Sequence, residues 1–148
     1  MKISAQYLAG VADSDGSFSF GRKYNKQRAK DYFVASFQLT WKRTLESKNV
    51  FDELVKIYGG SYFDHFTHTS FGRVRILKYC ATGRALVKIC NDVLPHLLLK
   101  KAHAWIALQG AELKSRQWGR GGKPDSIWKR ELELYLRMNK LNTKNKKI

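Results

Sequence analysis

Two carboxylates, Asp13 and Asp15, lie in the segment Asp13-Ser14-Asp15-Gly16, just before the alternating run Ser17-Phe18-Ser19-Phe20. Side chains two residues apart do not share a helix face, so these two are not expected to hold one ion symmetrically. One carboxylate with a neighbouring backbone carbonyl suits Mg²⁺, which prefers oxygen ligands and retains waters. Such a site suits phosphoryl chemistry, in which substrate oxygens complete the metal shell. An Asp/Gly turn that merely ends a helix is the alternative.

The charge of the chain indicates the kind of partner. Its 148 residues include 28 Lys and Arg against 12 Asp and Glu, a formal net charge of +16 with a pI near 10.0. Such a field attracts polyanions, either nucleic acid or an anionic membrane. With 43% hydrophobic residues the chain can form a packed core. Its length predicts one domain over 1–148.

The first half of the chain predicts the elements around this segment. A helix is expected over 4–13, with Ser4 as N-cap and Gly16 as a left-handed C-terminal cap. A face of small residues, Ala5, Ala9, Ala12 and Gly16, would let two helix backbones approach closely. Period-two alternation then predicts a hairpin through Phe18–Phe20 and Phe33–Lys42, and a helix over 46–58 ending at Gly59-Gly60.

The second half predicts another hairpin and more helices. Strands are expected over 61–67 and 72–81, and helices over 83–93, 96–114 and 126–142. The resulting class is α+β, with an α-β-β-α-β-β-α core over about 4–115 and added C-terminal helices. A basic tail is expected over 140–148. Cys80 and Cys90 are too far apart for a zinc site, and no signal peptide or membrane span is predicted. A soluble intracellular protein, in an organelle or a prokaryotic cytoplasm, is therefore expected.

The stretch Leu8-Ala9-Gly10-Val11-Ala12-Asp13-Ser14-Asp15-Gly16 resembles the defining motif of the LAGLIDADG homing endonucleases in order and spacing. The predicted element order is also similar to the core of that family. The resemblance implies an intron-encoded type of DNA endonuclease with a saddle-shaped antiparallel sheet. Because only one motif is present, it implies a homodimer with the motif helices at its centre, Ala5, Ala9, Gly10, Ala12 and Asp13 lying at the interface.

The resemblance also implies roles at the catalytic site. Asp15 matches the family's metal-binding acid, and the backbone carbonyl of Ser14 would be a further ligand for Mg²⁺ or Mn²⁺. Lys100 is similar in place to a basic residue near the scissile phosphate, with Lys42, Arg43 and Lys48 as competitors for a second basic role. Trp41 stands where some relatives have a water-positioning Gln, which is a departure from the family pattern.

DNA would be read by the polar faces of the strands. The expected contacts are Ser17, Ser19, Lys23, Gln38, Thr40, Lys42, Arg73 and Arg75. Arg pairs bidentately with guanine and Gln with adenine in the major groove. The family implies cleavage of a long, pseudo-palindromic double-stranded site with short 3′ overhangs, and no small-molecule substrate or membrane partner. An RNA maturase or a non-cleaving regulator on the same fold, and a basic structural nucleoprotein, are the alternatives.

Overall fold

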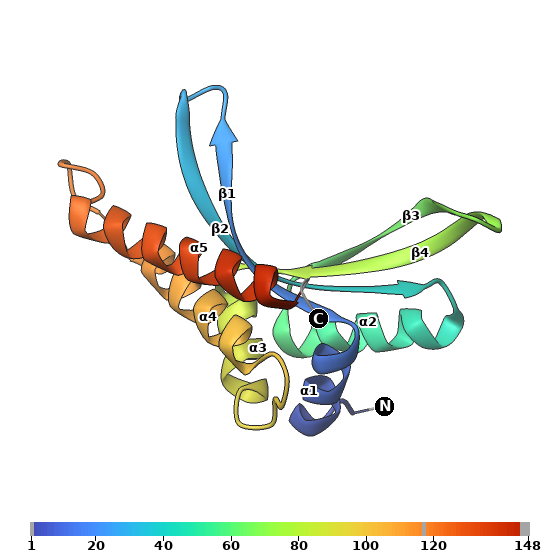
Figure 1. The fold of residues 1–148 in the computed structure, drawn as a ribbon. Helices are drawn as coiled ribbons and strands as arrows, with labels where there is room; N and C mark the ends of the chain where they lie inside the picture. Colours follow the sequence, from blue (N-terminus) through green and yellow to red (C-terminus); the bar gives the residue numbers. More distant parts are fainter. Residues whose placement is uncertain (1, 117, 146–148) are drawn as a thin grey trace.

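The computed structural model describes residues 2–116 and 118–145, and the expected α+β order is confirmed (Figure 1). The elements along the chain are α1 (Ala5–Ser14), β1 (Gly16–Asn25), β2 (Lys30–Lys42), α2 (Leu45–Tyr58), β3 (Ser61–Thr69), β4 (Gly72–Ala81), α3 (Gly83–Val93), α4 (Lys101–Ser115) and α5 (Asp125–Asn145).

The boundaries of the last two helices differ from the expectations in ways that matter for the site. The stretch from 96 to 100 forms turns, so α4 starts five residues later than predicted. The last helix continues to Asn145, so Lys140 and Lys144 belong to a helix instead of a tail. Lys146 and Lys147 of the expected tail lie outside the described residues.

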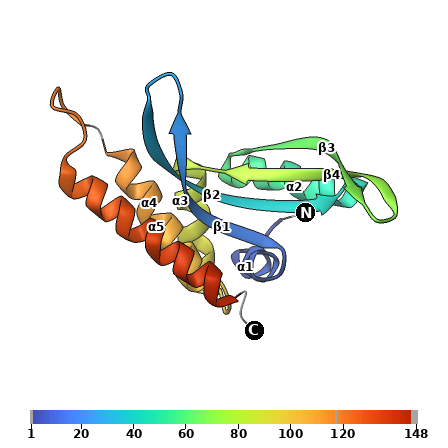
Figure 2. The same cartoon turned by 45° about the horizontal axis from the view of Figure 1, so that its top comes forward.

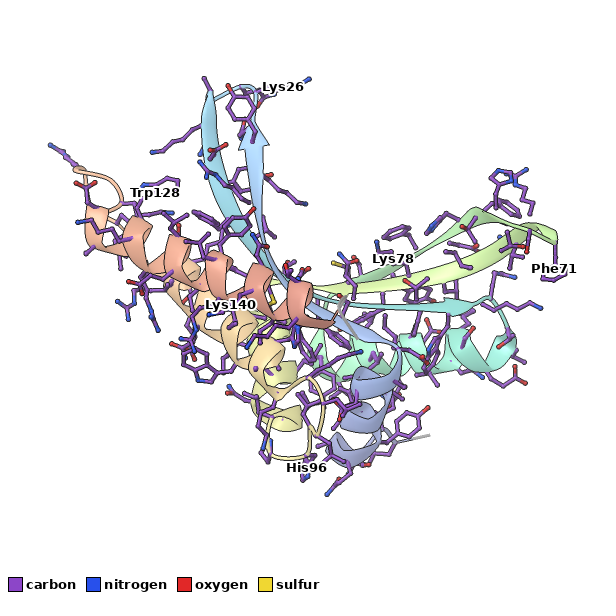
Figure 3. The ribbon with its side chains drawn as sticks, viewed as in Figure 1. Lys26, Phe71, Lys78, His96, Trp128 and Lys140 are labelled. Carbon is purple, nitrogen blue, oxygen red and sulfur yellow. The ribbon has the colours of Figure 1, made fainter. Side chains whose placement is uncertain are left out.

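The four strands form one antiparallel sheet in the order β1-β2-β4-β3. In Figure 1 the two hairpins diverge above a concave surface, with α1, α2 and α3 below the sheet. Lys26 and Phe71 mark the two hairpin tips in Figure 3. Figure 2 shows α4 and α5 side by side along the flank of the β1–β2 hairpin. The saddle-like sheet is therefore as expected.

Alternation along the strands sorts side chains onto two faces. On β2, Phe33, Ala35, Phe37 and Leu39 are buried against the helices. Their registered partners, such as Phe18 opposite Phe37 and Phe20 opposite Ala35, are buried on the same side. This helix-facing side holds the core, so the other side of the sheet is the concave one.

Gly16 does not adopt the left-handed cap conformation that was expected. Asp15 ends α1 with right-handed torsions (φ −112°), and Gly16 is the first residue of β1. A Cβ on Gly16 would lie 2.7 Å from Ala12 Cα and 2.7 Å from Phe37 Cε2. The position therefore requires glycine because α1 and β2 pack closely there, and not because of its torsions.

Candidate functional site

The carboxylate of Asp15 is exposed at the C-terminal end of α1 and is oriented by a single side chain. Trp41 Nε1 donates a hydrogen bond to Asp15 Oδ2 at 3.0 Å. The indole ring itself stacks on the buried Phe51, with ring centroids 5.4 Å apart and planes 22° apart. One carboxylate oxygen is therefore anchored by a packed ring, and Oδ1 has no protein donor among the described residues.

Asp13, in contrast, is occupied within the chain. Its carboxylate accepts hydrogen bonds from the backbone N–H groups of Leu98 (2.7 Å), Leu99 (3.2 Å) and Lys100 (2.9 Å). Burial alone would raise the pKa of Asp13, but these donors and the Lys100 charge together lower it below the ordinary value. Asp13 therefore joins α1 to the turn before α4, an intrachain role in addition to the interface position predicted for it.

Lys100 lies beside the same helix end. Its Nζ donates to the carbonyl oxygens of Ala12 (3.0 Å) and Gly16 (2.6 Å), which flank Asp15 in the chain. A cation at a helix C-terminus is favoured by the helix dipole. Of the three candidates for a second basic role, Arg43 and Lys48 are held by the carboxylates of Asp64 and Asp52, and Lys42 lies on the concave side of β2. Thus Lys100 is the predicted basic residue that the fold brings to the end of α1.

The predicted interface face of α1 requires a correction. Ala9 (1% exposed) and Ala12 (0%) are buried in the chain's own core, and Ala5 is half-buried beside them. Their small size lets α1 pack closely on β1 and α3 of the same chain. The exposed strip of α1 instead contains Gln6, Gly10 and Ser14, at i, i+4 spacing. Only Gly10 of the predicted small residues faces solvent, and a Cβ there would meet nothing within 4 Å.

Most of the predicted DNA-reading residues lie on the concave face. Register places Ser17 opposite Gln38, and Thr40 and Lys42 follow on the same side of β2. Ser19 also faces this side, although its hydroxyl is hydrogen-bonded to that of Ser36 at 2.7 Å. Lys23 continues the same face along β1 and is exposed. The alternation in the sequence is sufficient to find these positions.

Arg73 and Arg75 are the exceptions. Their side chains point to the same face of β4 as those of the buried Leu77 and Tyr79. They therefore lie on the side of the sheet opposite Gln38. Arg75 is paired with Asp64, and Arg73 stacks over the ring of Phe66 at 3.8 Å. These two predicted DNA contacts therefore lie on the other side of the sheet from the remaining six.

The sequence analysis missed three residues near these groups. Lys78 is registered opposite Thr40 and points into the concave side in Figure 3. His103 and Asn142 line a hollow of about 550 Å³ together with Lys100, Gly16 and Ser17. Burial lowers the pKa of His103 below its ordinary value, which favours the neutral imidazole. Alternation from Leu77 and Tyr79 could have found Lys78, whereas the α5 contact of His103 had no local signal.

No group of three or more His, Cys, Asp or Glu side chains is gathered for a metal anywhere in residues 2–116 and 118–145. His65 and His68 lie on opposite faces of β3 and do not form a pair. Asp15 therefore offers one free carboxylate oxygen, and the carbonyl of the preceding residue, Ser14, lies at the same helix end. This donor set fits an oxygen-preferring ion only when substrate oxygens supply the remaining ligands.

No family model matches the sequence, and no curated protein matches it. Solved structures do match, and they place the chain in one class: it has the fold of the homing endonucleases. The resemblance to the LAGLIDADG family is thus confirmed at the level of the fold.

In three of these matches, the similarity covers most of both chains. The homing endonuclease I-CvuI, solved in complex with its target, gives a TM-score of 0.68 at 21% identity over 93% of this chain and 80% of that one. The archaeal intron-encoded I-Vdi141I complexed with DNA gives 0.67 at 16% identity over 92% and 82%. The homing endonuclease I-TnaI gives 0.62 at 16% identity over 94% and 90%.

No helix within the described residues is both long and apolar enough to cross a bilayer.

Proposed function

We propose that this chain is a site-specific, metal-dependent double-strand DNA endonuclease that acts as a homodimer. The reaction is phosphodiester hydrolysis at a long, pseudo-palindromic site, leaving short 3′ overhangs. The fold shared with DNA-bound homing endonucleases supports the class, and the residues of this chain support the polyanion and the acid.

The distribution of charge across the sheet carries the proposal. The strand positions on the concave side contain no Asp or Glu. The strand lysines on that side therefore have no carboxylate neighbour there; they are Lys23, Lys30, Lys42 and Lys78. The two strand acids, Asp31 and Asp64, lie on the helix-facing side and are paired with arginines. A face built in this way attracts phosphate backbones and leaves polar side chains for the base edges.

Asp15 and the carbonyl of Ser14 would hold Mg²⁺ or Mn²⁺, which supplies Lewis acidity toward the phosphate and lowers the pKa of a bound water. Trp41 keeps the Asp15 carboxylate in one orientation. Lys100, fixed by two carbonyls beside Asp15, supplies positive charge where the scissile phosphate would gain negative charge. I-CvuI was solved with its target in the presence of Ca, and with another target in the presence of Mg without cleavage of the DNA.

A homodimer would form through the exposed strip of α1. Gly10 lies in the middle of this strip with open space above it, so a partner helix could approach there at backbone distance. Two copies of Asp15 would then lie near each other at the ends of the paired helices. Because a two-fold axis relates the subunits, each would read one half of a palindromic site.

The test is a cleavage selection on a partially palindromic DNA library, with the ends of the products sequenced. Parallel reactions contain Mg²⁺, Ca²⁺, or Mg²⁺ with Asp15→Asn. Discrete, symmetric ends that need both Mg²⁺ and intact Asp15 are expected. Normal cleavage by pure Asp15→Asn would refute the assignment of the acid, and enrichment by binding without any cut ends would refute the nuclease.

One further observation favours a second candidate, an RNA maturase on the same fold. A groove between α4 and α5 is lined by Lys101, Trp105, Arg137, Lys140 and Lys144. Arg137 lies over the Trp105 ring at 5.2 Å, an arrangement of cation and aromatic that suits single-stranded nucleic acid. Charge reversal at Lys140 and Lys144 would weaken RNA binding and in vitro intron splicing, with DNA cleavage retained, if this candidate is correct.

A further inference from the structure

The β3–β4 hairpin carries a group of three apolar side chains on its concave side. Phe63, Val74 and Ile76 all have concave parity, and Phe63 is 50% exposed. His65 stacks on Phe63, with ring centroids 5.3 Å apart, and is registered opposite Ile76. The corresponding part of β1–β2 presents Ser17, Ser19, Gln38 and Thr40. The two hairpins, or arms of the sheet, therefore present different side chains next to the β2–β4 junction, and the β1–β2 arm has apolar positions of its own, Val34 and Tyr32, toward its tip.

These apolar side chains are not part of the hydrophobic core. They lie on the side of the sheet opposite the buried Leu77 and Tyr79, and no described helix covers them. Contiguous exposed apolar side chains on a soluble protein commonly mark a binding surface. Lys42 is registered directly beside Ile76, and Lys78 directly beside Phe63, so two of the three apolar side chains are adjacent to a cation, and no strand acid lies on this face. This charge favours a polyanion as the occupant over a second copy of this +16 chain.

Phe, Val and Ile offer no hydrogen bond, so they cannot read the donor and acceptor pattern of a base pair. The one apolar group that the major groove exposes is the C5-methyl of thymine. We infer that the β3–β4 arm recognises thymine methyl groups in the major groove through Phe63, Val74 and Ile76. This inference rests on the proposed function and adds the chemistry by which one part of each half-site is read. The β1–β2 arm would read its part by hydrogen bonds instead.

The probe is the duplex recovered by selection from a randomised library, resynthesised with deoxyuridine in place of one thymine at a time. Deoxyuridine removes only the methyl group and leaves pairing unchanged. Binding is measured with Ca²⁺ in place of Mg²⁺. At one or more thymines of each half-site, deoxyuridine should weaken binding about fourfold, the effect expected for losing the burial of one carbon.

Variants connect these positions to the arm. For each of Phe63→Ser and Ile76→Thr, one of the sensitive positions should lose its effect. At that position the variant should bind the thymine and the deoxyuridine duplex with equal affinity. Phe66→Ser is the matched control, because Phe66 is 48% exposed on the same strand but faces the other side of the sheet. It should keep the full sensitivity of the wild type.

The outcomes separate the inference from the function on which it rests. A recovered, cleaved site at which no deoxyuridine matters would overturn the inference and leave the nuclease intact. Unchanged deoxyuridine sensitivity in both Phe63→Ser and Ile76→Thr would overturn it too. So would the finding that these two variants change only the oligomeric state of the protein. A library that yields no preferred site would overturn both the inference and the proposed function.

Discussion

Trp41 donates its indole N–H to Asp15 across 26 positions of sequence, and its ring rests on Phe51 beneath the sheet. The distance of 3.0 Å and the stacked ring mean that the carboxylate cannot rotate freely. Trp41, which departs from the family pattern at this position, thus supplies an N–H donor to the carboxylate. The other oxygen, Oδ1, has no protein donor among the described residues.

Trp41→Phe tests this relationship. Phenylalanine retains an aromatic ring that can stack on Phe51, and it removes the N–H donor together with one ring of the indole. Loss of a hydrogen bond that orients a metal ligand typically costs about 10- to 100-fold in metal affinity or activity. We therefore expect the Mg²⁺ concentration for half-maximal cleavage to rise by about this factor, with duplex affinity in Ca²⁺ changed much less. An unaltered Mg²⁺ titration in a normally folded variant would show that the hydrogen bond is incidental.

Lys100→Met separates charge from packing, because methionine keeps most of the methylene chain. The carbonyls of Ala12 and Gly16 lose their donor, so the free energy of unfolding should fall by about 2 kcal/mol. The cleavage rate should also fall at a temperature at which the variant is fully folded, where the loss of stability cannot account for it. Lys100→Arg should recover part of both. Cleavage equal to the wild type in folded Lys100→Met would leave Lys100 with a structural role alone.

Asp13→Ala should destabilise the protein at neutral pH by at least about 2 kcal/mol, since three backbone N–H groups lose a charged acceptor. Because the pKa of Asp13 is lowered in the folded state, its carboxylate stabilises the fold above its ordinary value of 3.8. That contribution is lost as the pH falls through the lowered pKa. Urea unfolding should thus show a gap between the two proteins that is full at pH 7 and narrows below pH 3.8. A gap independent of pH would contradict a role for the charge.

Gly16→Ala should be strongly destabilising. Its new Cβ would meet backbone and ring atoms at 2.7 Å, and overpacking of this kind costs about 1–3 kcal/mol or more. Gly10→Ala in α1 is the control, because a Cβ there meets nothing within the chain and alanine favours helix by about 1 kcal/mol. Thermal unfolding of the two variants should move in opposite directions.

Gly10→Leu tests the dimer separately. In an isolated chain the leucine would lie in solvent and leave the fold intact. If α1 pairs with its copy through this strip, the larger side chain blocks the approach and the dimer dissociates. Sedimentation should then give a folded monomer that no longer cuts both strands. A Gly10→Leu protein that remained dimeric and active would exclude this strip as the interface.

The sequence by itself determined the elements and their order. Local signals sufficed: period-two alternation from Phe33 to Leu39 defined β2, Ser4 capped α1 through a 3.1 Å bond from Tyr7 N–H, and Gly59 with Gly60 ended α2 at positive φ. The same alternation selected Gln38, Thr40 and Lys42 as one face. These features depend on neighbours within a few residues, so they can be read without knowing the fold.

Only the tertiary structure decided which surfaces face inward. The small residues Ala9 and Ala12 were compatible with either a partner helix or the chain's own sheet, and packing against β1 and α3 chose the second. Parity alone did not relate Arg73 to Gln38, because a face is shared between strands only once their register is known. Trp41 reaches Asp15, and Lys100 reaches Gly16, because distant segments meet at the end of α1. Such contacts depend on how whole elements pack, and the spacing of residues along the chain does not encode that packing locally.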